Sequence, residues 1–504
     1  MGKLGKSALR DLVVLAFDLG ASSCRAMVGY VNEAEKAVRV EELYRWPNYM
    51  VRIGDSLYWD VLRIWHEMKG VIKAAYKRFG SKLASIGVDT WGIDFALLDA
   101  SGQLVENPHT YRDPRTKGVS RELHKIVGPE EIFQCTGNHV LEINTLYQIY
   151  SLKLKRPAIL NSAKTFLMVP DLFNYWLTGD VTNEFSEATT TQMFDIRNKR
   201  WCLDIITRLG LPADIFSASI IEPGTELGTI TPALASELGI PKDIGVIAPA
   251  THDTGSAIAA APQVDESTGY ISSGTWSLVG VELKEPLFSE DGLRYNFTNE
   301  GGAFGTITYL KDLQGMWLVE ESRRVLAERG LELSYEEIVS KAMSAPSFTS
   351  FIDTDDDRFI SPLNMVDEIM RFIDETGQRR PANEGELFRV IYESLAFKYR
   401  LTFEQIEEVT KRRLERINVF GGGSRNSFLN QLIADFTGLP VFAGPDEATA
   451  IGNVLLQAAG LGVVKSLADL RQYVKLSYGL KEFTPSEAKR VEEAYSAYLK
   501  IVRK

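Results

Sequence analysis

The chain has 504 residues, of which 45% are hydrophobic and 24% are charged. These fractions exclude an intrinsically disordered chain, which combines low hydrophobicity with high net charge. Lysine and arginine number 56 and aspartate and glutamate 67, a formal net charge of −11. A chain this acidic is a poor general binder of nucleic acid, because phosphate contacts need a surplus of basic side chains. At about 150 residues per domain, the length predicts two to three domains.

Hydropathy and cysteine usage favour a cytoplasmic protein without a membrane partner. No stretch approaches the roughly 18 apolar residues that span a membrane. The apolar run at residues 12–17 is too short for a signal peptide. Cys24, Cys135 and Cys202 are too few and too far apart for a disulfide framework or a paired metal site, so we expect reduced thiols.

The predicted elements of the first half alternate between strand and helix. Residues 12–17 and 25–31 are rich in strand-forming side chains, and the small residues between them predict a hairpin. Apolar side chains at helical spacing predict a helix over 61–75, and residues 86–88 predict a buried strand. This alternation is typical of an α/β fold.

The second half repeats this pattern without repeating its residues. Residues 245–249 predict a short strand, and residues 270–279 predict two strands joined by a turn of small residues. The segment 259–268 contains a proline and has no periodicity, so it is the best boundary between the halves. We therefore predict one domain over 1–261 and another over 262–504.

The last part of the chain continues as an α/β pattern. Apolar residues four apart predict a long helix from Glu384. The elements expected after it are a strand at 417–420, a glycine turn at 421–423, a helix at 428–436, a strand at 439–442 and a helix at 448–459.

Three turns are rich in small or hydroxyl side chains, which lets backbone N–H groups approach a phosphate closely. The first turn lies at 20–24 and the second at 272–275. The guanidinium of Arg25 is placed to reach the same anion, and the carboxylate of Asp18 suits hydrated Mg²⁺. The third turn, 421–423, lies before a helix but lacks the third glycine of a dinucleotide fingerprint and the lysine of a Walker A loop. Tight turns needed only for packing are the alternative.

Asp253 follows a predicted strand directly, where α/β enzymes place catalytic groups. Its carboxylate suits a base that accepts the proton of an alcohol during phosphoryl transfer. His252 is the rival base, and we expect these adjacent side chains to point apart; a helix cap is the structural alternative for Asp253. Trp91 and Gly92 offer a flat apolar wall and bare backbone for a sugar, and a core tryptophan is the alternative.

Several blocks of the sequence, from Asp18 to about Gly462, resemble the FGGY carbohydrate kinases in family order. The blocks are residues 17–23, 89–95, 111–113, 251–254, 272–277, 298–302 and 421–423. The Asp-Thr-Trp-Gly and Ser-Gly-Thr-Trp-Ser forms favour the branch that phosphorylates L-rhamnulose on O1 in L-rhamnose breakdown. The resemblance implies two actin-like (ribonuclease H-like) α/β domains around a cleft, with ATP and Mg²⁺ as co-substrate and cofactor.

The resemblance also implies roles for single residues. Asp253 matches the general base and Asp18 the metal ligand. The residues implied for ATP are Ala21, Ser22, Ser23, Cys24, Arg25, Thr275, Glu320, Gly421, Gly422 and Gly423. The residues implied for the sugar are Trp91, Gly92, His252, Asp253, Thr254 and Asp312. The sequence departs from the family at Cys24, where glycine is common, at Asp312, where asparagine is expected, and at Glu320, where glutamine is usual.

Other functions remain open at this point. Within the family, L-fuculose, L-ribulose or D-xylulose are alternative substrates. From other classes, the same scaffold serves ATP-driven switches such as actin and chaperones, and a sugar-sensing regulator would bind without reacting. Family members are often dimers or tetramers, so the resemblance allows a homo-oligomer.

Overall fold

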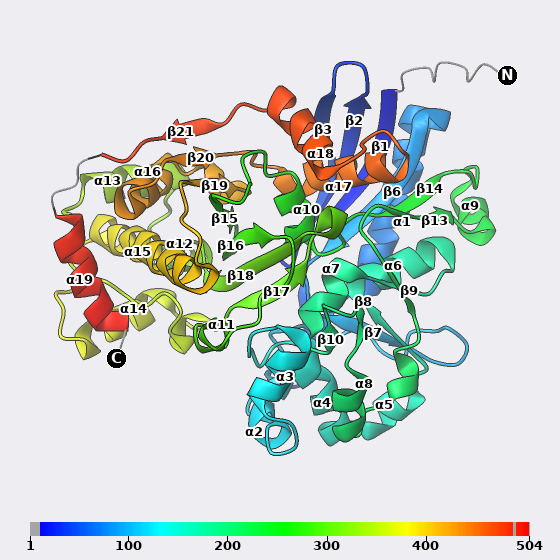
Figure 1. Ribbon diagram of the computed structural model, residues 1–504, viewed down its shortest axis with the longest axis horizontal. Helices are drawn as coiled ribbons and strands as arrows, with labels where there is room; N and C mark the ends of the chain where they lie inside the picture. The colour runs from blue at the N-terminus through cyan, green and yellow to red at the C-terminus, as the bar shows by residue number, and fades with distance from the viewer. Residues whose placement is uncertain (1–10, 487–489, 503–504) are drawn as a thin grey trace. The chain divides into compact units, whose positions relative to one another are not determined.

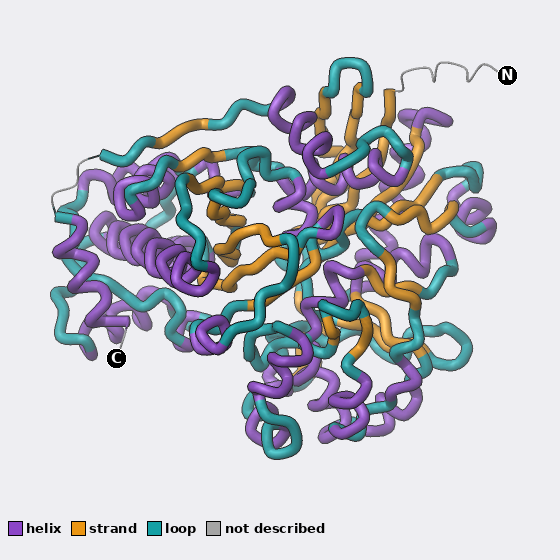
Figure 2. Tube along the Cα trace, in the orientation of Figure 1, coloured by secondary structure: helices purple, strands orange, loops and turns teal. Residues whose placement is uncertain are grey.

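The computed structural model describes residues 11–486 and 490–502, and its contacts divide the chain into two compact units. Both units mix helices and strands, as Figures 1 and 2 show, so the predicted α/β class is confirmed. The first unit comprises Met1–Pro262, Leu283–Tyr309 and Ala448–Tyr478; the second comprises Gln263–Glu282, Leu310–Glu447 and Gly479–Lys504. The division of the sequence at residue 262 into two domains stays a prediction.

A six-stranded sheet forms the centre of the first unit. Its order is β13-β14-β6-β1-β2-β3, and β1, β6 and β14 run parallel while the other pairs are antiparallel. The predicted hairpin and strands are confirmed, and the central strands are buried along nearly their whole length, as expected for parallel strands covered on both faces. The strands are β1 (Asp11–Leu19), β2 (Ser23–Asn32), β3 (Ala37–Pro47), β6 (Leu83–Thr90), β13 (Thr225–Thr229) and β14 (Gly245–Ala248).

Helices cover this sheet. Helix α1 (Val61–Phe79) buries the predicted apolar face, and the side chain of Asp60 caps its N-terminus by accepting a hydrogen bond from the Arg63 amide. Helix α17 (Ala448–Gly460) packs on β1, β2 and β6 and crosses α10 (Asp253–Ala259). A glycine allows this crossing, because a Cβ at Gly452 would lie 1.9 Å from a backbone oxygen of α10.

The remaining helices and strands of the first unit surround this core. They are β4 (Met50–Ile53), β5 (Ser56–Trp59), β7 (Phe95–Leu98), α2 (Val119–Leu123), α3 (Pro129–Thr136), α4 (Thr145–Lys155), α5 (Pro157–Ser162), β8 (Thr165–Met168), α6 (Val169–Thr178), β9 (Thr182–Glu184), α7 (Phe185–Ala188), β10 (Phe194–Asp195), β11 (Arg200–Trp201), α8 (Leu203–Arg208), β12 (Ser219–Ile221), α9 (Pro232–Leu238), α11 (Glu290–Arg294), β17 (Thr298–Gly301) and α18 (Leu467–Ser477).

The second unit also has a central sheet, with the strand order β18-β16-β15-β19-β20-β21. Strand β18 begins in the first unit, beside β17. The predicted hairpin, long helix and later elements are confirmed, except that the last strand begins at Val441 rather than at residue 439. The elements are β15 (Thr268–Ser273), β16 (Trp276–Leu283), β18 (Ile307–Gln314), α12 (Trp317–Glu328), α13 (Tyr335–Ser344), α14 (Met365–Glu375), α15 (Glu384–Thr410), β19 (Arg416–Phe420), α16 (Ser427–Thr437), β20 (Val441–Ala443), β21 (Lys481–Phe483) and α19 (Val491–Val502).

The cysteines correct one expectation. Cys135 and Cys202 form a disulfide that joins positions 67 residues apart, so the expectation of reduced thiols is wrong for this pair. Their spacing gave no sign of it, because the end of α3 and the start of α8 meet only in the folded chain. Cys24 is a free, buried thiol. Within residues 11–486 and 490–502, no helix is long and apolar enough to cross a membrane.

Candidate functional site

Carboxylates gather where the parallel strands of the first unit end. Asp18 of β1 and Asp89 of β6 are partners in the strand register, and Asp253 opens α10 after β14. Asp18 forms an ion pair with Arg25. Burial raises the pKa of Asp89, and the charge of Asp18 raises it further. The predicted base and the predicted metal ligand thus belong to one acidic site, in which each negative charge disfavours the next.

Asp253 keeps access to solvent, because 30% of its side chain is exposed. Thr254 Oγ1 donates a hydrogen bond of 3.2 Å to Asp253 Oδ1. Withdrawal from bulk water raises the pKa of Asp253, and Asp18 raises it further, while His252 opposes the shift. The cap position of α10 belongs to His252, so the cap alternative for Asp253 is wrong.

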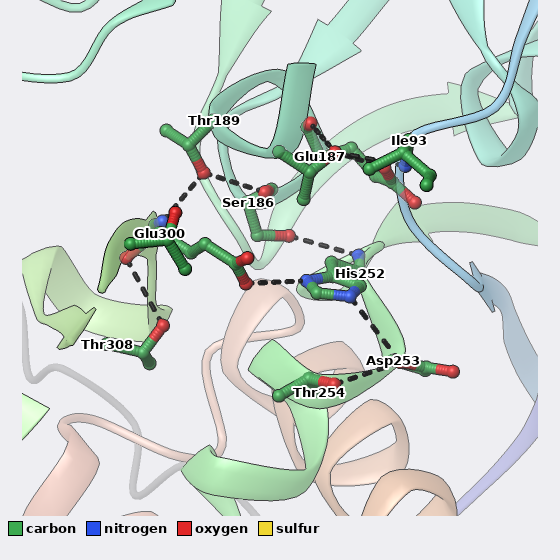
Figure 3. Close-up of polar contacts among 12 residues, drawn as sticks. Ile93, Ser186, Glu187, Thr189, His252, Asp253, Thr254, Glu300 and Thr308 are labelled. Carbon is green, nitrogen blue, oxygen red and sulfur yellow. Dashed lines mark hydrogen bonds and ion pairs between the residues drawn. The ribbon is translucent and has the colours of Figure 1, made fainter. Parts of the chain in front are cut away.

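His252 lies between two carboxylates, as Figure 3 shows. Its Nδ1 is 3.2 Å from Glu300 Oε2, and its Nε2 is 3.7 Å from Asp253 Oδ1. The expectation that the side chains of His252 and Asp253 point apart is therefore wrong. His252 has an extended backbone and Asp253 begins the helix, so the chain turns between them and brings both side chains to one side.

The backbone before Asp253 is held by a buried carboxylate that sequence reasoning missed. Glu184 accepts hydrogen bonds from the Thr251 amide at 3.0 Å, from Thr251 Oγ1 at 2.7 Å and from the Ser186 amide at 3.0 Å. Ser186 Oγ in turn accepts a 3.1 Å hydrogen bond from the His252 amide. Burial raises the pKa of Glu184. This network fixes the strand-to-helix turn that presents His252 and Asp253.

Gly92 lies against this turn. A Cβ at Gly92 would be 3.2 Å from His252 Nε2, so the missing side chain makes room for the imidazole. Trp91 is only 6% exposed and belongs to the core, as the alternative interpretation held. Its Nε1 donates a 3.0 Å hydrogen bond to Asp94 Oδ2, which also accepts from Trp59 Nε1 at 2.6 Å. Trp91 and Asp94 thus fix the backbone on either side of Gly92, and a direct sugar contact by Trp91 stays a prediction.

The first predicted phosphate turn is tight, and hydrogen bonds within the turn and from Asn48 hold its backbone. The Gly20 amide donates to the Ser23 carbonyl, and Asn48 Nδ2 donates to the Gly20 carbonyl at 3.0 Å. Ser22 is exposed, and Ala21 and Ser23 are half-buried. The side chain of Cys24 is fully buried, so a nucleotide contact at this position would come from its backbone.

The second unit brings other predicted nucleotide residues together. Thr275 is exposed in the turn between β15 and β16, and the glycine turn follows β19. A Cβ at Gly423 would lie 2.0 Å from Ser273 Oγ, and Gly421 has a φ of 80°. Ser273 Oγ is buried without a hydrogen-bond partner among the described residues. The two turns therefore meet at a buried hydroxyl, and the absence of a side chain at Gly423 makes room for this contact.

Two of the three departures from the family, Asp312 and Glu320, lie in the second unit. Glu320 is in the first turn of α12, where it accepts a hydrogen bond from the Tyr335 hydroxyl. Asp312 is half-buried on β18. Their roles toward nucleotide and sugar stay predictions.

Asp89 is a further residue that sequence reasoning did not single out. Its Oδ2 accepts a 2.5 Å hydrogen bond from Asn453 Nδ2, and its Oδ1 is buried without a partner among the described residues. Asn453 also lies next to Gln457, whose Nε2 donates to Asn453 Oδ1 at 2.7 Å. The signal in the sequence was its place at the end of a predicted strand, in the same block as Gly92.

Comparison with known proteins identifies the chain's relatives. Models described as the FGGY family of carbohydrate kinases, N-terminal and C-terminal domains, match residues 13–259 and 269–461. A protein named Rhamnulokinase from Oceanobacillus iheyensis is 40% identical, over 92% of this chain and 97% of its own length. The Rhamnulokinase of Halalkalibacterium halodurans is 41% identical, over 94% of this chain and 99% of its own.

Solved structures show the same fold. Gluconate kinase from Lactobacillus acidophilus matches with a TM-score of 0.82 at 15% identity, covering 98% of each chain. Xylulose kinase from the same organism matches with a TM-score of 0.80 at 16% identity, covering 97% of this chain and 98% of its own. The predicted actin-like α/β fold is confirmed by this likeness.

Proposed function

Because the chain belongs to the FGGY family of carbohydrate kinases, we propose that it transfers the γ-phosphoryl group of ATP to O1 of L-rhamnulose. The observation that carries this choice of sugar is the 36–41% identity to relatives named Rhamnulokinase over most of the chain. The product is then L-rhamnulose 1-phosphate, in the breakdown of L-rhamnose.

In the proposed mechanism Asp253 is the general base. Its carboxylate accepts the proton of the O1 hydroxyl as that oxygen attacks the γ-phosphorus in line. A raised pKa suits this role, because it brings the affinity of the carboxylate for a proton closer to that of the developing alkoxide. Gly92 lies against the imidazole of His252, the residue before the base, and we assign its bare backbone to the sugar.

The remaining residues position the nucleotide. Arg25 and the backbone of residues 21–24 are assigned to the phosphates, and Thr275 with the glycines 421–423 to the rest of ATP. Positioning and charge neutralisation make up most of phosphoryl-transfer catalysis, so these groups need no chemistry of their own. Among the proposed sugar contacts, ionised Asp312 accepts a hydrogen bond from a hydroxyl but cannot donate one, unlike the expected asparagine.

Family membership implies a divalent cation with ATP, and we propose Mg²⁺. Carboxylate oxygens are its preferred ligands, and the Asp89 oxygen without a hydrogen-bond partner and the repulsion between Asp18 and Asp89 both fit a cation held there. Within the described part of the chain, no three His, Cys, Asp or Glu side chains form a ready-made metal site. Mg²⁺ is typically held by one or two carboxylates plus substrate phosphates, so Asp18 would hold it together with ATP. When bound, the cation neutralises charge on the phosphates.

Family membership reduces the number of alternative functions. A switch protein or a non-reacting sensor has no need of a general base, and the matching family models describe carbohydrate kinases. L-Fuculose, L-ribulose and D-xylulose remain rival substrates within the proposal. A cytoplasmic location, homo-oligomers and independence of nucleic acid and membrane stay predictions from the sequence.

Phosphorus NMR of the reaction mixture tests the proposal. Incubation with ATP, Mg²⁺ and L-rhamnulose should give one new sugar phosphate, whose phosphorus couples to the protons of C1. A phosphate on another carbon, or ADP and inorganic phosphate without any sugar phosphate, would refute it.

A further inference from the structure

Strand β17 brings a buried carboxylate to His252. Glu300 is 5% exposed, and its Oε2 lies 3.2 Å from His252 Nδ1. No described residue donates a hydrogen bond of good geometry to this oxygen, and the contact with His252 Nδ1 is an ion-pair contact. A carboxylate that is almost completely buried from solvent needs a partner at the ring nitrogen it faces, because burying an unpaired charge costs free energy.

The backbone around Glu300 is pinned, so the position of the carboxylate is set by the fold. The Gly301 amide donates to Thr189 Oγ1 at 2.7 Å. The Asn299 amide donates to the Gly137 carbonyl at 3.1 Å, and Asn299 Nδ2 donates to the same oxygen at 3.0 Å. Figure 3 shows Thr189 and Ser186 beside Glu300 and His252: Thr189 Oγ1 accepts from the amide of Gly301, next to Glu300, and Ser186 Oγ accepts from the His252 amide.

The other ring nitrogen faces the base. His252 Nε2 is 3.7 Å from Asp253 Oδ1, which is longer than a hydrogen bond but within the range of charge pairing. The imidazole is closed in on its Gly92 side, where a Cβ would come within 3.2 Å of Nε2. A carboxylate that accepts a proton at one imidazole nitrogen fixes which way the other nitrogen points.

We propose that Glu300 is a positioning residue for phosphoryl transfer. Its carboxylate pairs with the protonated Nδ1 of His252 and so orients Nε2 toward the carboxylate of Asp253. Glu300 need not touch sugar, nucleotide or metal in this role. The inference rests on the proposed function only in taking Asp253 as the base.

A double-mutant cycle tests the proposal in the full chain. Glu300→Ala should lower kcat about 10- to 100-fold, as losses of residues that orient a functional histidine do. Glu300→Gln, which keeps an acceptor oxygen without the charge, should lose less. KM for ATP should stay within about twofold in both, because Glu300 acts on the base. In the His252→Gln background, Glu300→Ala should cost less than about twofold, since the residue through which it acts is gone.

A matched control separates positioning from loosening of the strand. Thr308 is 2% exposed, and its Oγ1 donates to the Glu300 carbonyl at 3.4 Å. Thr308→Val removes that hydrogen bond and leaves the carboxylate, so it should lower Tm slightly and leave kcat near that of the wild type. If Thr308→Val lowers kcat as much as Glu300→Ala does, the effect is structural and the proposal is wrong.

A spectroscopic arm does not depend on activity. The chain has 5 histidines, so ring-labelled ¹⁵N-histidine gives few signals, and His252→Gln identifies those of His252. The wild type should show a protonated Nδ1 at His252, and Glu300→Gln should change this signature without changing the others. Unchanged His252 signals, or an undiminished kcat loss in the His252→Gln background, would overturn the inference. A wild type that phosphorylates no ketose refutes the proposed function, and the ring spectrum still decides the Glu300 contact.

Discussion

Asp253 combines a partly exposed carboxylate with a raised pKa, which is the state a general base needs. Asp253→Asn keeps the size of the side chain and removes the base, so kcat should fall by about 10²- to 10⁴-fold. Affinity for a non-hydrolysable ATP analogue, measured by calorimetry, should change by less than about threefold. A variant that retains a third of wild-type kcat would rule Asp253 out as the base.

The buried carboxyl of Asp94 makes the stability of the folded chain depend on pH. Burial raises the pKa of Asp94 from 3.8 to about 6, despite hydrogen bonds from both tryptophans. The folded chain therefore binds this proton more tightly than the unfolded chain, so the contribution to stability is full below about pH 4 and is lost as pH rises to about 6. The loss is about 3 kcal/mol by linkage.

Asp94→Asn should remove that loss. As pH rises from 4 to 6.5, the free energy of unfolding, measured in urea, should fall in the wild type relative to the variant. The difference between the two changes should be up to about 3 kcal/mol. Asp99→Asn is the control of opposite sign, because hydrogen bonds lower the pKa of Asp99. Parallel pH profiles for the wild type and Asp94→Asn would show that Asp94 is ionised throughout.

At the scale of elements, the crossing of α10 and α17 depends on one glycine. A Cβ at Gly452 would lie 1.9 Å from the Ser256 carbonyl oxygen, so Gly452→Ala must push the helices apart. We expect destabilisation of about 1–3 kcal/mol, or more if the crossing cannot relax. Gly70→Ala in helix α1 is the matched control: no atom of a described residue lies within 4 Å of its Cβ, so it should be neutral or stabilise by up to about 1 kcal/mol. Equal Tm values for the two variants would contradict the close crossing.

Gly423 and Gly422, in the turn after β19, form a second pair of a test position and its control. Gly423→Ala places a Cβ 2.0 Å from Ser273 Oγ and should lower Tm and raise KM for ATP about tenfold or more, whereas nothing described lies within 4 Å of a Cβ at Gly422. Gly422→Ala should therefore leave the Tm of the ligand-free protein within about 1 °C. Ser273→Gly in the Gly423→Ala background should restore part of the lost stability. Failure of Gly423→Ala to change either quantity would show that the turn has room for a side chain.

Across the whole molecule, the sequence predicts single helices and strands but not the contacts between residues that are far apart in the chain. Apolar spacing predicts a helix over 61–75, which the structure extends to Phe79, and the strand before Asp253 follows from a short apolar run and its turn. No local pattern shows that Cys135 meets Cys202 or that Glu300 meets His252, because these contacts join elements far apart in the chain. Short-range periodicity reports one element at a time, and pairing between elements depends on the tertiary fold.

The same limit explains the site. The sequence suggests Asp253, Gly92 and Asp18 because each follows a predicted strand or turn, and their roles stay predictions. Glu184 and Glu300 lie in segments whose patterns are unremarkable, and their importance comes from the groups that face them. A sequence alone therefore predicts the residues at strand ends better than the buried carboxylates that hold them in place.

The central claim is that this chain is a kinase whose preferred acceptor is L-rhamnulose. A coupled ADP-release assay over L-rhamnulose, L-fuculose, L-ribulose and D-xylulose, with ATP and Mg²⁺ fixed, measures kcat/KM for each ketose. We predict the highest kcat/KM for L-rhamnulose, with turnover lost in Asp253→Asn on every acceptor. A higher kcat/KM for another ketose, or no sugar-dependent ADP release at all, would contradict the account.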